Sequence, residues 1–126
     1  YICDRMNDRI QVFTMDGEYK RCINPGLIMP SALASFGETL VVAELSARLV
    51  LLDINDQIID LIGDGRADYV ELEGWPNRLR DGCPVWPEDL VDGKFNSPHG
   101  LTADPSGNIY VFEWLIKGRY IKLQLK

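Results

Sequence analysis

Apolar and polar residues along the chain follow a short pattern that recurs. Residues 9–13 alternate between polar and apolar side chains, which is typical of a half-buried β-strand. Strand-like runs at residues 1–4 and 19–23 flank them, and the Asp-Gly pair at positions 16 and 17 favours a tight hairpin turn. The first part of the chain therefore predicts three short antiparallel strands.

The same order of strand, turn and strand returns twice. Residues 40–44, 48–53 and 58–63 form the second copy, and residues 109–113 and 119–123 form the third. Each of these two copies begins with an additional strand, which starts at Pro30 in one and at Pro98 in the other. A four-stranded unit that repeats roughly every 40 residues is typical of a β-propeller blade. The sequence therefore predicts an all-β chain.

An acidic residue ends the second strand of each copy, and an arginine begins the third strand. The pairs are Asp4 with Arg9, Glu44 with Arg48, and Glu113 with Arg119. Opposite charges across a hairpin form an ion pair, which contributes little to stability when solvent surrounds it. We therefore expect these pairs on an exposed rim, in a structural role rather than a catalytic one.

The copies together correspond to about two and a half four-stranded blades of a partial β-propeller. They form one domain, with blade portions at residues 1–25, 26–63 and 96–126 and an inserted rim loop at residues 64–95. Propellers close with roughly four to eight blades. Because incomplete blades leave sheet edges open, we expect the chain to complete a ring with a missing propeller half or with further copies of itself.

Charge and cysteine content limit the classes of partner. The 126 residues carry a formal net charge of −6 with dispersed lysines and arginines, which argues against nucleic acid, and no apolar run is long enough to span a membrane. Cys3, Cys22 and Cys83 lack the spacing of a metal cluster, so buried free thiols are expected, with a Cys3–Cys22 bridge as the alternative. The sequence predicts a soluble protein and leaves its compartment open, a secreted or periplasmic location included.

Several of these motifs resemble the NHL family of six-bladed propellers. The shared pattern is Asn-Ile-Tyr-Val before an acidic residue, then an arginine and Asp-Gly, and versions of it occur in all three copies. Residues 3–13 and 97–104 also resemble segments of the peptidyl-α-hydroxyglycine α-amidating lyase family and its bacterial relatives. The resemblance implies that this chain corresponds to the C-terminal portion of such a propeller.

The lyase resemblance implies roles for particular residues. In that family, histidines at the starts of inner strands hold a catalytic metal, usually zinc, and an arginine after the second strand of a blade helps to bind substrate. By position, His99 matches a metal ligand, Arg5 matches the arginine, and Ser31 occupies the histidine position one blade earlier. Catalytic zinc needs about three protein ligands. The ligand set is therefore incomplete in this sequence, and we expect the 126-residue chain by itself to be inactive as a lyase.

Strand direction predicts which residues share a rim. Because neighbouring strands run antiparallel, the start of each first strand lies beside the end of each second strand. Arg5, His99, Ser31 and the acidic residues Asp4, Glu44 and Glu113 would then share one rim with the inserted loop. His99 would lie nearest the central channel, as a metal ligand or as a histidine hydrogen-bonded in the channel wall. Arg5 would bind a carboxylate or remain a solvated turn residue.

The inserted loop carries Trp75 and Trp86 among several prolines. Such a loop suits a lid over a ligand or a contact with a partner, and packing on its own aromatic residues is the alternative. Tyr69, Tyr110 and Tyr120 are available as a catalytic base, but their spacing selects none of them.

Two classes of function follow from these expectations. The first is a metal-dependent, amidating-lyase-like enzyme that acts at the channel mouth of the complete propeller. The second is a non-enzymatic propeller scaffold that binds a protein, a peptide or a small molecule on the same rim.

Overall fold

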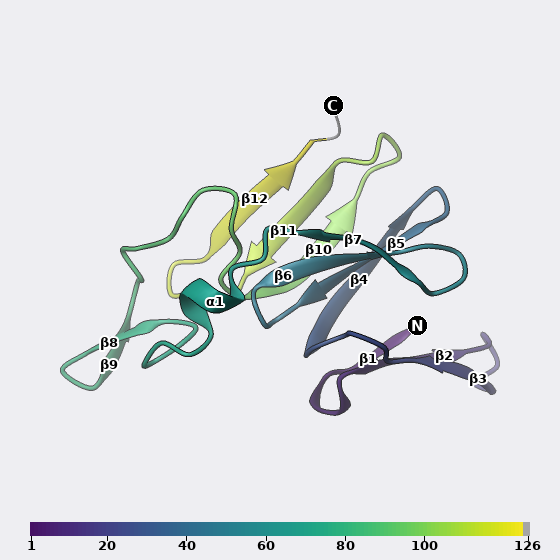
Figure 1. Ribbon diagram of the computed structural model, residues 1–126, viewed down its shortest axis with the longest axis horizontal. Helices are drawn as coiled ribbons and strands as arrows, with labels where there is room; N and C mark the ends of the chain where they lie inside the picture. Colours follow the sequence, from purple (N-terminus) through teal and green to yellow (C-terminus); the bar gives the residue numbers. More distant parts are fainter. Residues whose placement is uncertain (125–126) are drawn as a thin grey trace.

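The computed structural model describes residues 1–124, which form short antiparallel strands in three packed sheets and one separate hairpin (Figure 1). The first sheet contains β1 (Ile2–Asp4), β2 (Arg9–Phe13) and β3 (Tyr19–Ile23). The second sheet contains β4 (Pro30–Phe36), β5 (Thr39–Glu44), β6 (Arg48–Leu52) and β7 (Ile58–Ile62). The third sheet contains β10 (Pro98–Ala103), β11 (Ile109–Glu113) and β12 (Arg119–Leu123).

The predicted all-β class is confirmed, and the strands lie in sheets in the order in which they follow one another along the chain. The predicted acid–arginine partners are also directly opposite each other in the antiparallel register. Asp4 pairs with Arg9, Glu44 with Arg48, and Glu113 with Arg119. The turn between the first of these pairs is a short 3-10 helix (Arg5–Asn7), which ends at Asp8 in the left-handed conformation.

The second sheet lies between the other two (Figure 1). Apolar side chains fill both junctions. Between the first and second sheets, Ile10 and Val12 pack with Val42, Val50 and Leu52. Between the second and third sheets, residues from both sides form another cluster: Val41, Ala43, Leu49, Phe95, Ile109 and Val111. Face-to-face packing of successive sheets is thus the main source of buried apolar surface.

The position of each sheet explains its pattern of side chains. The second sheet is covered on both faces, so β5 and β6 contain consecutive buried apolar residues instead of an alternating pattern. β2 and β11 lie in the outer sheets, and every second residue of their central part is buried. Strands in the same order therefore differ in burial pattern according to whether one or two neighbouring sheets cover them.

The inserted segment at residues 64–95, predicted to be an extended loop, contains some regular structure. It includes a short helix α1 (Arg66–Tyr69) and a hairpin of β8 (Arg78–Arg80) and β9 (Cys83–Val85), which pairs with no other sheet within residues 1–124. Figure 1 shows this hairpin projecting away from the three sheets. The ends of the segment meet where Phe95 N donates to Gly63 O over 2.9 Å.

All three cysteines are free in the part of the chain that the structure describes, so the alternative of a Cys3–Cys22 bridge is wrong. The prediction that the thiols are buried is also wrong, because Cys3 and Cys22 are half-buried and Cys83 is exposed. Cys3 lies opposite Ile10, whereas Cys22 lies opposite Gln11. Adjacent residues of a strand point to opposite faces, so the two thiols lie on opposite sides of the first sheet. Burial raises the pKa of the Cys3 thiol. No helix within residues 1–124 is long and apolar enough to cross a membrane.

Candidate functional site

Arg5 and His99 come together although 94 residues separate them in the sequence. The Arg5 Nη2 atom lies 3.1 Å from His99 Nε2. Arg5 belongs to the 3-10 turn after β1, and His99 is the second residue of β10, so the contact joins the first sheet to the third. The two residues that the lyase resemblance singles out therefore share one exposed site.

Ser31 sets the spacing between the inner strands beneath this site. Its hydroxyl lies 2.9 Å from Ala43 O in its own sheet and 2.8 Å from Pro98 O in β10, and the two carbonyls share its single donor hydrogen. The start of β4 is thereby attached to the start of β10, immediately before His99. Ser31 is thus a positioning residue whose hydroxyl is already engaged.

The contact with Arg5 defines the protonation state of the imidazole. A guanidinium group is only a donor, so His99 Nε2 accepts the hydrogen bond and Nδ1 carries the ring hydrogen. Partial burial and the positive charge of Arg5 both lower the pKa of His99. A neutral imidazole with its Nε2 lone pair facing a cation is therefore the dominant form near pH 7.

An exposed tryptophan that was not among the residues predicted from the sequence completes the site. The ring centroids of Trp114 and His99 lie 5.8 Å apart, and Trp114 remains 57% exposed. Trp114 follows the acidic residue that ends β11, just as Arg5 follows Asp4 at the end of β1. Aligning the residue after each acid would have marked both positions.

Glu44 and Glu113 do not lie on an accessible rim, contrary to the expectation from the sequence. The side chains of Glu44 and Arg48 are 0% and 5% exposed, and those of Glu113 and Arg119 are 0% and 17% exposed. The Asp4–Arg9 pair is more open, with 22% and 40% of the two side chains exposed. The ion pairs form as predicted, but burial prevents Glu44 and Glu113 from meeting a ligand.

The buried carboxylates instead hold the chain that enters each inner strand. Glu44 Oε1 accepts a hydrogen bond from Ile28 N at 2.6 Å, and Arg48 donates to Gly26 O. Burial raises the pKa of Glu44, while the hydrogen bonds from Arg48 and Ile28 oppose that rise.

Glu113 has the same role in the third sheet. Its Oε1 atom accepts from Asn96 N at 2.5 Å and from Ser97 N at 3.1 Å, and Arg119 donates to Lys94 O. The entry into β10 is thereby fixed two residues before His99. In the second and third sheets, the acid–arginine pair thus positions the start of the inner strand. In the third sheet, this strand carries His99 of the candidate site.

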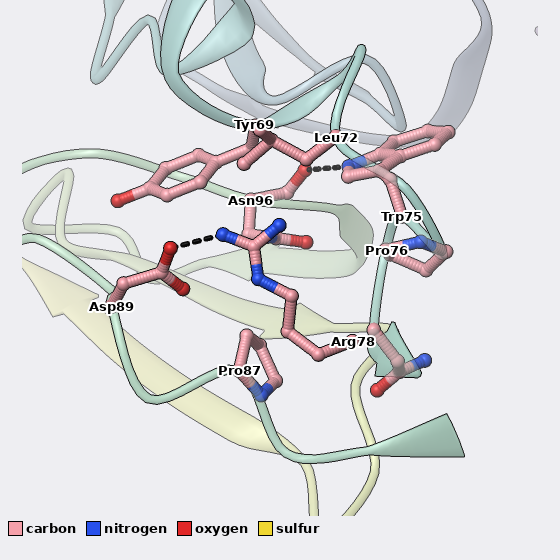
Figure 2. A pocket seen from close by; sticks show the side chains of 9 residues that line it. Tyr69, Leu72, Trp75, Pro76, Arg78, Pro87, Asp89 and Asn96 are labelled. Atoms are coloured by element: carbon pink, nitrogen blue, oxygen red, sulfur yellow. Dashed lines mark hydrogen bonds and ion pairs between the residues drawn. The ribbon is translucent and has the colours of Figure 1, made fainter. Parts of the chain in front are cut away.

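The inserted segment packs on its own side chains near Asn96 (Figure 2). Trp75 Nε1 donates to Asn96 O at 3.0 Å, and Arg78 forms an ion pair with Asp89. The hollow between these residues has room for about 10 Å³, which is close to the space that a single water requires. This arrangement is a small packed core and is too small for an organic ligand.

The second tryptophan of the insertion, Trp86, lies beside the hairpin with Leu79 and Val85. The insertion also reaches the candidate site indirectly, because Ile116 N donates to Asn77 Oδ1 at 2.7 Å. Ile116 belongs to the turn that carries Trp114. The inserted segment therefore supports that turn from one side.

Two of the tyrosines named as possible bases have other partners. The Tyr69 hydroxyl accepts a hydrogen bond from Val91 N, and the Tyr110 hydroxyl lies 3.2 Å from Asp104 Oδ2. Tyr120 packs edge to face on Phe112 in the outer face of the third sheet. These contacts give none of the three hydroxyls a role at His99.

The residues around His99 do not fit a zinc site on their own. Within residues 1–124, no group of three or more His, Cys, Asp or Glu side chains is arranged to hold a metal ion. The nearest polar partner of His99 Nε2 is the Arg5 guanidinium, a cation that would repel a metal at that nitrogen. The chemistry of the described site therefore favours an anion over a cation.

No protein-family model and no curated protein matches this chain.

Proposed function

We propose that the chain forms part of an NHL-type β-propeller and that the surface of Arg5, His99 and Trp114 binds the carboxylate of a small molecule or a peptide. The observation that carries this proposal is the Arg5–His99 contact between two different sheets. The propeller is supported by the recurring sheets, each packed face to face on the next, and by the NHL-like motifs. In this reading the molecule is a binding scaffold.

The donors at the site suit a carboxylate. Arg5 has five N–H groups, and within residues 1–124 its side chain makes one hydrogen bond, to His99. The neighbouring Asp4 carboxylate accepts hydrogen bonds from three other side chains, those of Asn7, Arg9 and Gln11. Arg5 thus keeps donors for a ligand, His99 offers its Nδ1–H, and the exposed Trp114 ring offers an apolar surface.

A matched pair of probes tests this proposal. N-acetylphenylalanine should bind and perturb the Trp114 fluorescence and the His99 NMR signals, whereas its neutral amide should not. A bound carboxylate favours the imidazolium ion, so the pKa of His99 should rise when the acid binds. Arg5→Gln should weaken binding of the acid by roughly tenfold or more, because a charge-assisted hydrogen bond is lost.

Arg80→Gln provides the control, because Arg80 lies in the projecting hairpin with a 67% exposed side chain. It should bind the acid as the unchanged chain does. Equal binding of acid and amide, or an undiminished affinity in Arg5→Gln, would contradict a carboxylate site.

The lyase-like function is the second candidate, and one observation favours it. The two residues that correspond to a metal ligand and a substrate arginine in the resemblance meet in space. We propose that any such activity belongs to a complete propeller in which further zinc ligands join His99, because the residues described here do not supply a metal site.

Zinc binding and product formation by the 126-residue chain test this second candidate. Titration with zinc should show no tight one-to-one binding, and incubation with α-hydroxyhippurate and zinc should yield no glyoxylate above a chain-free control. Tight stoichiometric zinc binding with glyoxylate release, both abolished by His99→Gln, would show instead that this chain is itself the lyase.

A further inference from the structure

The two outer sheets each leave one apolar face exposed. On the outward side of the first sheet, which we call the head face, Ile2 and Tyr19 are 56% and 57% exposed, and Tyr19 packs edge to face on Phe13. On the outward side of the third sheet, which we call the tail face, Phe112 and Tyr120 are 46% and 73% exposed and also pack edge to face. Exposed apolar patches of this kind are typical of interaction surfaces.

The internal repeat shows what covers a tail face. Aligning each acid–arginine pair puts Phe112 at the position of Ala43 and Tyr120 at the position of Leu49. Ala43 and Leu49 are both 0% exposed, because the third sheet packs on that side of the second sheet. We call the side of a sheet that packs on the preceding sheet its leading side, and the opposite side its trailing side. The equivalent cover of Phe112 and Tyr120 is therefore the leading side of another such sheet.

The same alignment shows what covers a head face. Ile2 and Phe13 occupy the positions of Val42 and Leu52, which are 0% and 1% exposed under the first sheet. Each junction inside the chain thus joins the trailing side of one sheet to the leading side of the next. A tail face is complementary to a head face and not to a second tail face.

From this complementarity we infer that two copies of the chain associate head to tail through both pairs of faces. Each copy contributes three packed sheets, so two copies give about six, within the range of four to eight at which propellers close. A closed pair buries all four exposed faces. It also places the two Arg5–His99 sites on the same rim, around one channel.

Two complementary variants test the inference. The tail variant carries Phe112→Glu and Tyr120→Glu, and the head variant carries Ile2→Glu and Phe13→Glu. By light scattering after size exclusion, the unchanged chain should have twice the 14.3 kDa mass of one copy. Each variant alone should be monomeric, because every head-to-tail junction needs one intact face of each kind.

An equimolar mixture of the two variants should form a one-to-one pair. The intact head face of the tail variant meets the intact tail face of the head variant, so a single junction is restored. Met15→Glu is the control, because Met15 is fully exposed in the turn between β2 and β3, outside both faces, and it should dimerise normally. Far-ultraviolet circular dichroism checks that each variant keeps its strands.

Several outcomes would overturn the inference. A monomeric unchanged chain at all concentrations would do so without reliance on any variant. A variant that still dimerises alone would indicate like faces in contact, and concentration-dependent filaments of the unchanged chain would show that the ring does not close at two copies. The carboxylate site lies within one copy, so its binding test succeeds or fails independently.

Discussion

At the scale of single residues, the acid–arginine pairs share one sequence motif but differ in burial, and we expect them to differ in their contribution to stability. The pair of Glu44 and Arg48 is almost fully buried, whereas solvent reaches both members of the Asp4–Arg9 pair. Solvent screens an exposed pair, but a buried pair whose partner is lost leaves an uncompensated charge in an apolar environment. The middle sheet should therefore depend on its pair far more than the first sheet does.

Glu44→Ala tests this difference. The substitution leaves the Arg48 guanidinium and the Ile28 N–H without their buried acceptor, so the free energy of unfolding should fall by about 3–5 kcal/mol. Asp4→Ala is the matched control and should cause a much smaller loss. Urea denaturation followed by circular dichroism measures both, and equal losses would show that burial does not decide the contribution of the pair.

At the scale of elements, the number of covering sheets decides how many residues of a strand are buried. β5 and β6 are apolar on both sides because a sheet packs on each of their faces. In β2 and β11 buried residues alternate with more exposed ones, because one face of each strand remains outward, although that face of β11 also carries the apolar Phe112. The repeat could be recognised from turns and charged pairs in all copies, but the burial of corresponding residues differs between them.

The inserted segment is held to the sheets by a few contacts, of which the Trp75 contact with Asn96 O is central. Trp75→Ala should make amide hydrogen exchange in residues 66–95 roughly tenfold faster or more, because a hydrogen bond and packed aromatic surface are lost. Trp86→Ala, beside the hairpin, serves as the comparison and should accelerate only the hairpin amides. Unchanged exchange around α1 in Trp75→Ala would show that Trp75 does not anchor the segment.

At the scale of the whole molecule, the packing of three sheets creates the candidate site. Arg5 and His99 lie in the first and third sheets, and the second sheet between them sets their separation. Ser31 bonds the start of β4 to the start of β10, which fixes that separation at the inner strands. A substitution that shifts the sheets would therefore affect the site without touching either residue.

The sequence by itself determined the all-β class, the strand boundaries to within a residue or so, and the opposing acid–arginine partners. These properties depend on near neighbours in the chain, because side-chain alternation and turn residues specify a strand and its hairpin register. Local pattern was therefore sufficient for them.

Only the tertiary structure decided which pairs are buried, that Trp114 joins the site, and that Arg5 contacts His99. Each of these depends on which sheet covers which face, and that is determined by packing between residues far apart in the sequence. The hairpin of the insertion was not predicted, because β8 and β9 are each three residues long and, unlike the equally short β1, lie outside the repeat.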